Sequence, residues 1–314
     1  MSDGDPGAAL QELHRLKRKI RKTVNLLEAE RRYDDLDSRI EAIADAVVAR
    51  AAQQHQQSRL KDIVATFTSY RAQRIVRSHI DHHKRRQIQD ILRQGLLRWE
   101  TDIRAEDDFG SGLDERVVEI PLALETAALN VPGHVLDAGA ALNHAFVRDA
   151  VGPLAADLVH FTQSASREIP IFEGSRVSYM FGDLRSMPFR DHYFDRVVCI
   201  STLEHVGMNN ARYGGAAEDA VGTIGAAVSE LLRVLAPGGT MLITVPFGEP
   251  AYQGWFRIFG PEDVDGLVAA AGRCTVAVRY YRFDGRWLSV SGGTAVIPSD
   301  GDEVRALAAI RLVK

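Results

Sequence analysis

The chain has 314 residues, of which 46% are hydrophobic and 25% charged, an ordinary composition for a soluble globular protein. No stretch approaches the roughly 18 apolar residues that a membrane helix needs, so we expect no membrane span. The first ten residues lack the basic flank and apolar core of a secretory signal, and Cys199 and Cys274 both lie in apolar segments. These features predict a cytoplasmic protein with two reduced, buried thiols.

The net charge of −4 hides an asymmetry between two parts of the chain. Residues 1–100 carry 20 Lys and Arg against 14 Asp and Glu, a net of +6, whereas the remainder carries 18 against 28, a net of −10. Such a split suggests two modules. The basic part is explained either by a solvated helix face or by a phosphate-rich partner.

Residues 9–100 contain no proline and one glycine, Gly95, and therefore predict helices. Apolar residues recur every three or four positions over 13–27 and 36–47, which predicts a short coiled coil or helical hairpin that joins copies into a homo-oligomer. Histidines 79, 82 and 83 lie on a further predicted helix, 58–99, but the basic residues beside them disfavour a metal ion. The acidic, glycine-containing segment 106–115 reads as a linker. We therefore predict a helical module, 1–105, and a second domain, 106–314.

After residue 130, short apolar runs alternate with helical patterns, such as the helix expected over 218–235. Alternation of this kind predicts an α/β fold, a doubly wound and mostly parallel sheet with helices on both faces. The last two runs have no helix between them and should pair antiparallel. Ligands of such sheets bind at the carboxyl ends of the strands. The predicted strands are 135–136, 158–161, 177–180, 197–200, 240–245, 275–281 and 308–313.

Three strand ends carry candidate binding residues. Gly139 follows the first strand and lets the backbone turn sharply toward a ligand, but a single glycine argues against a pyrophosphate site. Asp137, just before it, either faces a cationic ligand or orders the turn by accepting backbone N–H groups. After the third strand, the Asp183 carboxylate can accept the amine of a purine while Leu184 covers the ring. The fourth strand opens into "STLEH", which contains Glu204 and His205.

The segments "VLDAGA", "GDLRSMPF", "FDRVVCISTLEHV" and "ELLRVLAPGGTMLITVP", in this order, resemble the class I S-adenosylmethionine-dependent methyltransferases. The likeness covers about residues 115–314 and is greatest to the small-molecule, type 11-like branch. It implies a Rossmann-like sheet of seven strands, the last antiparallel, and S-adenosyl-L-methionine as cofactor. The cofactor-binding positions that it implies are Asp137, Gly139, Ala140 and Asn143 for the methionine and ribose part, Asp183 and Leu184 for adenine, and Ser201 for the wall facing the sulfonium.

One position departs from the family pattern. The second strand of these enzymes usually ends in an acid that holds the ribose hydroxyls, whereas this strand continues as "HFTQSAS". Thr162 or Gln163 would have to replace the acid through neutral hydrogen bonds, which are weaker than charge-assisted ones.

An alcohol acceptor must lose its proton during methyl transfer, and His205 is the candidate catalytic base because its ordinary pKa suits neutral pH. Glu204 would orient it or line the pocket. In a simpler interpretation, both residues only cap the following helix and contact the cofactor. A Glu–His pair could also join a divalent ion, but we predict no metal site.

The choice of acceptor is restricted mainly by motifs that the chain lacks. The chain lacks the P-P-Y-type tetrapeptide, the Pro-Cys nucleophile and the paired-glutamate loop of other methyltransferase branches, which argues against nucleic acid as a partner. A small molecule or a glycan remains, and "STLEHVGMNNARYG" resembles enzymes that modify cell-surface polysaccharides. We predict O-methylation of a sugar or glycan intermediate. The alternatives are methylation of a secondary metabolite and an inactive methyltransferase-like scaffold acting through its coiled coil. Aromatic residues that could stack on the acceptor, or that ordinary core packing explains as readily, are Tyr213, Trp255, Phe256, Phe259 and Trp287.

Overall fold

The computed structural model describes residues 85–163, 172, 174–210, 224–297 and 304–314. The predicted coiled coil, the three histidines at 79–83 and Tyr213 lie outside these residues. Ile88–Gly110 together with Asp114–Lys314 form one compact unit. The module boundary after residue 105 stays a prediction.

The unit contains helices and strands in alternation over most of its length. The helices are η1 (Ala105–Asp107), α5 (Arg116–Ala127), α6 (Ala145–Val151), η2 (Leu203–His205), α7 (Ile224–Val234), α8 (Pro261–Ala270) and α9 (Gly292–Ala295). The strands are β1 (His134–Ala138), β2 (Asp157–Thr162), β3 (Val177–Phe181), β4 (Phe194–Ile200), β5 (Leu235–Pro246), β6 (Ala251–Tyr252), β7 (Arg257–Ile258), β8 (Thr275–Phe283), β9 (Trp287–Val290) and β10 (Ala306–Val313).

The main sheet has the strand order β3-β2-β1-β4-β5-β10-β8-β9. β1 to β5 are parallel, and β10 runs antiparallel to both β5 and β8. All seven predicted strands are present, and the predicted α/β class and antiparallel final strand are confirmed. The sheet has an eighth strand, β9, which the sequence analysis missed. The "LAPGG" segment, which joins the helix predicted over 218–235 to the strand predicted over 240–245, is the start of β5, where the pairing with β4 shifts register.

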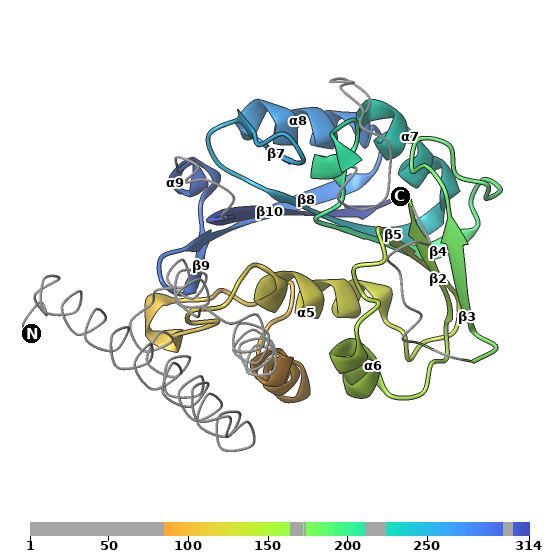
Figure 1. Cartoon of the computed structure of the whole chain (residues 1–314), viewed down its shortest axis with the longest axis horizontal. Coiled ribbons are helices and arrows are strands. Elements are labelled where there is room, and N and C mark those ends of the chain that lie inside the picture. The colour runs from red at the N-terminus through yellow and green to blue at the C-terminus, as the bar shows by residue number, and fades with distance from the viewer. Residues whose placement is uncertain (1–84, 164–171, 173, 211–223, 298–303) are drawn as a thin grey trace, which may run out of the picture. The chain divides into compact units, whose positions relative to one another are not determined.

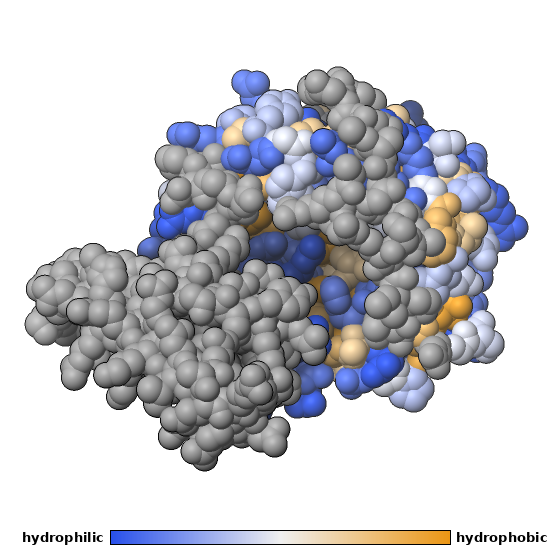
Figure 2. Space-filling view, viewed as in Figure 1, coloured by the Kyte–Doolittle hydropathy of each residue, from blue (hydrophilic) through white to orange (hydrophobic). Residues whose placement is uncertain are grey.

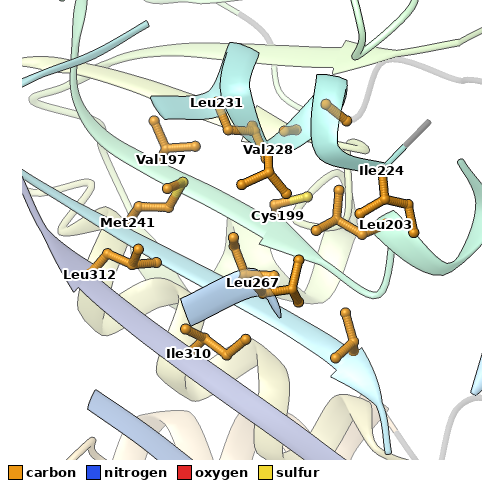
Figure 3. Packing of buried hydrophobic residues seen from close by; sticks show 14 of the residues in the cluster. Val197, Cys199, Leu203, Ile224, Val228, Leu231, Met241, Leu267, Ile310 and Leu312 are labelled. Carbon is orange, nitrogen blue, oxygen red and sulfur yellow. The ribbon is translucent and has the colours of Figure 1, made fainter. Parts of the chain in front are cut away.

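Helices cover both faces of the sheet, α5 and α6 on one side and α7 and α8 on the other (Figure 1). The core on the α7 side is apolar because each element turns its hydrophobic side chains inward. Figure 3 shows Val197 and Cys199 of β4 and Met241 of β5 packed against Val228 and Leu231 of α7. Burial raises the pKa of the Cys199 thiol, which favours the uncharged side chain, whereas Cys274, also predicted to be buried, is only half-buried.

The segment before α5 is hydrogen-bonded to the outer strand of the sheet. The helix over residues 85–94 ends at Gly95, whose positive φ of 60° allows a Schellman-type turn. Further along, the backbone N–H of Ile103 donates to Ser289 Oγ, and the Ser289 N–H donates back to the Ile103 carbonyl. The Trp287 N–H donates to the Phe109 carbonyl. Residues 103–109, the N-terminal strap, thus pair with β9.

The described surface is mostly hydrophilic, with separate hydrophobic patches, some of them on the side where β3 lies (Figure 2). Among the described residues, no helix combines the length and the apolar character needed to cross a bilayer.

Candidate functional site

A pocket of about 270 Å³ lies at the carboxyl ends of β1 to β4. This is the edge at which doubly wound sheets bind ligands. The residues predicted to contact the cofactor or acceptor divide into two groups. Those that line the pocket are Gly139, Ala140, Thr162, Asp183, Leu184, Ser201 and His205, whereas Asp137, Asn143 and Glu204 lie behind its wall.

Asp137 orders the turn after β1. Its side chain is fully buried and accepts the backbone N–H groups of Ala141, at 3.1 Å, and Leu142, at 2.8 Å. His160 Nδ1 lies 2.8 Å from Asp137 Oδ2, across the paired strands β1 and β2. Of the two roles considered for Asp137, these contacts favour the ordering of the turn.

Gly139 gives this turn its shape. Its φ of 106° disfavours any side chain, and a Cβ would overlap the hydroxyl of Thr202. Ala140 also has a positive φ, 56°, which is uncommon for a residue with a side chain and marks a constrained backbone. Asn143 lies further back, where its Oδ1 accepts a hydrogen bond of 2.9 Å from the Tyr179 hydroxyl. The turn therefore presents backbone, rather than side chains, to the pocket.

The end of β2 is polar and uncharged where it meets the pocket. Thr162 and Gln163 both line it, at the position where the methyltransferase resemblance leads one to expect an acid. A ribose bound here would meet a hydroxyl and an amide.

The loop after β3 is more exposed. Asp183 accepts hydrogen bonds from the backbone N–H of Arg185 and from its guanidinium, and both side chains line the pocket. The side-chain hydrogen bond from Arg185 lowers the pKa of Asp183 below its ordinary value, against a smaller opposing effect of burial. Asp183 is thus an ionised carboxylate at the edge of the pocket.

The wall after β4 is tied to helix α5 by residues that the sequence analysis missed. Ser201, with a φ of 40°, donates to Glu119 Oε1 at 2.5 Å, and Thr244 donates to the same oxygen at 2.6 Å. Arg116 Nη1 donates to Glu119 Oε2 at 2.8 Å and lines the pocket. Burial alone would lower the pKa of Arg116, but the carboxylates around it, Glu119 first, raise it above its ordinary value. Arg116 therefore stays protonated at the pocket wall, where it is paired with the Glu119 carboxylate.

His205 has a fixed orientation. Its Nδ1 lies 2.8 Å from the carbonyl oxygen of Trp255, and the two rings stack with centroids 5.2 Å apart. Because a carbonyl only accepts hydrogen bonds, Nδ1 of the neutral ring carries the proton and Nε2 carries the lone pair. Nε2 is thus the nitrogen that can accept a proton.

The Glu204 side chain lies near this nitrogen but is buried. Its Oε1 lies 4.0 Å from His205 Nε2, and its buried Oε2 has no hydrogen-bond partner among the described residues. Burial raises the pKa of Glu204 well above its ordinary value, which favours the protonated carboxyl.

Three of the aromatic residues expected near the acceptor belong to the core instead. Phe256, Phe259 and Trp287 are buried, and none of them lines the pocket. Packing explains them, because their strands and loops face the sheet interior. Trp255 stacks on a predicted catalytic residue, His205, and Phe256 lies behind the same ring, with centroids 6.4 Å apart. Among the described residues, no cluster of three His, Cys, Asp or Glu side chains could hold a metal ion.

A family model described as a methyltransferase domain matches residues 154–243. This segment runs from just before β2 into β5 and includes the ends of β2, β3 and β4 that line the pocket. Together with the strand order, the match confirms the predicted resemblance to the class I, S-adenosylmethionine-dependent methyltransferases. The polysaccharide branch of that resemblance stays a prediction. No curated protein matches the chain.

Several solved structures are similar in fold. The [4+2]-cyclase SpnF is 20% identical, with 52% of this chain and 58% of that protein covered and a TM-score of 0.38. A Burkholderia thailandensis 1,6-didemethyltoxoflavin-N1-methyltransferase with bound S-adenosylhomocysteine is 17% identical, with 60% and 73% covered and a TM-score of 0.40. A Haemonchus contortus phosphoethanolamine N-methyltransferase 2 is 16% identical, with 59% and 49% covered and a TM-score of 0.42. The chain thus spans less than two thirds of the first and third of these proteins, and likenesses this low support no conclusion about its acceptor.

Proposed function

We propose that this chain transfers a methyl group from S-adenosyl-L-methionine to a hydroxyl group of a sugar or glycan intermediate. The observation that carries the proposal is His205, a histidine in the pocket wall whose proton-accepting nitrogen is fixed by the Trp255 carbonyl. The choice of a sugar rests on the resemblance of residues 201–214 to enzymes that modify polysaccharides.

The residues in the pocket fit this cofactor. The side-chain-free turn at Gly139 leaves room for the methionine and ribose part, and Thr162 offers the ribose a hydroxyl. Asp183 and Leu184 suit the adenine ring. Arg116 suits the cofactor carboxylate, because it remains charged beside the pocket. When bound, the cofactor supplies a methyl group on a sulfonium, which makes that carbon electrophilic.

The protein then has two tasks. It holds the acceptor oxygen in line with the methyl group, which in general contributes up to about 7–11 kcal/mol. The bound sulfonium would supply the methyl group and keep the electron pair of the broken bond, and the proton of the attacking hydroxyl would pass to Nε2 of His205. The imidazolium that forms retains its hydrogen bond to the Trp255 carbonyl. A positioned base of this kind contributes about 10²–10⁴-fold.

The test replaces His205 by Asn, which can keep the hydrogen bond to Trp255 but cannot take the proton. Transfer of labelled methyl groups would be measured on nucleotide sugars and oligosaccharides, with phenolic metabolites as the competing class. We expect the turnover of His205→Asn to fall about 10²–10⁴-fold, with its affinity for S-adenosylhomocysteine nearly unchanged. His134→Asn, outside the pocket, is the matched control.

Three outcomes would contradict parts of the proposal. Undiminished turnover in His205→Asn would show that His205 is not the base. Labelling of phenols instead of sugars would favour the secondary-metabolite alternative. Calorimetry that finds no binding of S-adenosylhomocysteine to the wild type would favour an inactive scaffold.

A further inference from the structure

The carboxylate of Asp183 binds one neighbour, Arg185, through three N–H groups. Oδ1 accepts the Arg185 backbone N–H at 2.8 Å. The single Nε–H is shared between Oδ1 and Oδ2, at 2.9 Å to each, and Oδ2 also accepts from Nη2 at 2.5 Å. A carboxylate has about four lone-pair positions, so about one is left for a further donor.

The proposed function requires the same oxygens. An adenine ring beside Asp183 and Leu184 offers its 6-amino group as the donor that Asp183 would accept. The amino group would have to share the carboxylate with the guanidinium or displace one of the guanidinium N–H groups from it. Arg185 and the adenine are thus competing partners for a single acceptor.

The position of the pair makes such an exchange inexpensive. The Asp183 side chain is 44% exposed and that of Arg185 is 22% exposed, so water can solvate both groups as they separate. Ion pairs at such partly exposed positions contribute little to stability. The loop itself stays in place, because the Arg185 backbone hydrogen bond to Asp183 does not depend on the guanidinium.

We infer that the Arg185 guanidinium competes with the adenine amino group for Asp183, and that it lowers both the affinity for the cofactor and the preference for a 6-amino purine. The inference rests on the proposed function, since it concerns the same cofactor site. In the absence of adenine the guanidinium occupies the carboxylate, and on binding it moves aside. A 6-oxo purine gains less binding affinity from Asp183, because its oxygen cannot donate a hydrogen bond to the carboxylate. The Arg185 guanidinium, in contrast, can donate to that oxygen.

Calorimetry with two probes tests the inference: S-adenosylhomocysteine and its 6-oxo counterpart, S-inosylhomocysteine. We expect Arg185→Ala to bind the adenosyl compound about two- to fivefold more tightly than the wild type, the range set by an exposed ion pair. The ratio of the two affinities should rise by a similar factor. Arg176→Ala is the matched control, because Arg176 pairs with Asp157 at 3.0 Å at the amino ends of β2 and β3, away from the pocket.

A double-mutant comparison keeps the test independent of effects on folding. In an Asp183→Asn background, the further change Arg185→Ala should leave the affinity for S-adenosylhomocysteine unchanged. Equal or weaker adenosyl binding by Arg185→Ala, or an unchanged ratio, would overturn the inference while leaving the proposed function intact. Failure of the wild type itself to bind S-adenosylhomocysteine would instead overturn the proposed function, and the inference with it.

Discussion

Two turns at the same edge of the sheet each contain an aspartate, yet the two side chains are in opposite physical settings. Asp137, after β1, is fully buried, and its partners are backbone N–H groups and a buried histidine. Asp183, after β3, is partly exposed, and its side-chain partner is a single arginine. Backbone partners cannot leave without unfolding the turn, whereas an arginine side chain can. The difference separates an acid that builds the site from an acid that can exchange ligands.

The largest expected effect is the loss of stability when Asp137 is removed, compared with the small loss when Asp183 is removed. Asp137→Ala leaves two backbone N–H groups and His160 without their buried acceptor, which should lower the free energy of unfolding by about 3 kcal/mol. Asp183→Ala removes an exposed ion pair and should cost less than about 1 kcal/mol. Urea unfolding of both variants measures the comparison. Similar losses in the two variants would show that the two turns do not differ in this way.

The glycines of the two turns give a smaller, parallel effect. Gly139→Ala should cost about 2 kcal/mol and weaken the binding of S-adenosylhomocysteine, because it combines a positive φ with overlap onto Thr202. Gly182→Ala should cost about 1 kcal/mol, because its Cβ would lie 2.9 Å from the Phe161 ring, which has to shift. Gly272→Ala, with a φ of 61° and no neighbour near its Cβ, measures the backbone cost alone. If Gly139→Ala were no worse than Gly272→Ala, the contact with Thr202 would be unimportant.

Glu204, after β4, is a third acidic residue at this edge of the sheet, and its replacement has the smallest expected effect on stability. It is buried like Asp137 but lacks such partners, and burial raises its pKa well above 4.5. The folded protein therefore keeps a proton that the unfolded chain releases, so this group lowers stability as the pH rises above about 4.5. Glu204→Gln should be more stable than the wild type by about 1 kcal/mol at pH 8, and less so at pH 5. Thermal unfolding between pH 5 and pH 8 measures the difference in stability between Glu204→Gln and the wild type, with the exposed Glu249→Gln as the control. A difference that becomes smaller as the pH rises would contradict the prediction.

The parts of the fold visible in the sequence are those governed by local pattern. Apolar runs identified the strands of the parallel sheet, and the lack of a helix between the last two predicted their antiparallel pairing. β9 was missed because it is short, although "DG" at 284–285, between β8 and β9, is a recognised hairpin signal. Glu119 was missed for a different reason. Its partners Ser201 and Thr244 are 82 and 125 residues away, and only the folded sheet brings them to α5.

For the candidate site, too, the sequence indicated what local pattern determines and missed what only the folded structure determines. Proximity to a strand end predicted which residues would gather at the pocket, since strand direction alone determines that edge. It could not distinguish side chains that face the pocket from those that turn inward, as Asp137 and Glu204 do. That choice depends on which donors lie behind the turn.

The N-terminal strap has a practical consequence for any shortened form of this protein. Residues 103–109 pair with β9, so they cover what would otherwise be an open sheet edge. Truncation at residue 100 keeps the strap. If the N-terminal helices join copies of the chain, as we propose, this truncation should lower the number of chains in each assembly in solution. Truncation at 106 would expose unpaired N–H and C=O groups, which invite strand pairing between molecules. The shorter protein would then aggregate for a reason unrelated to its natural assembly.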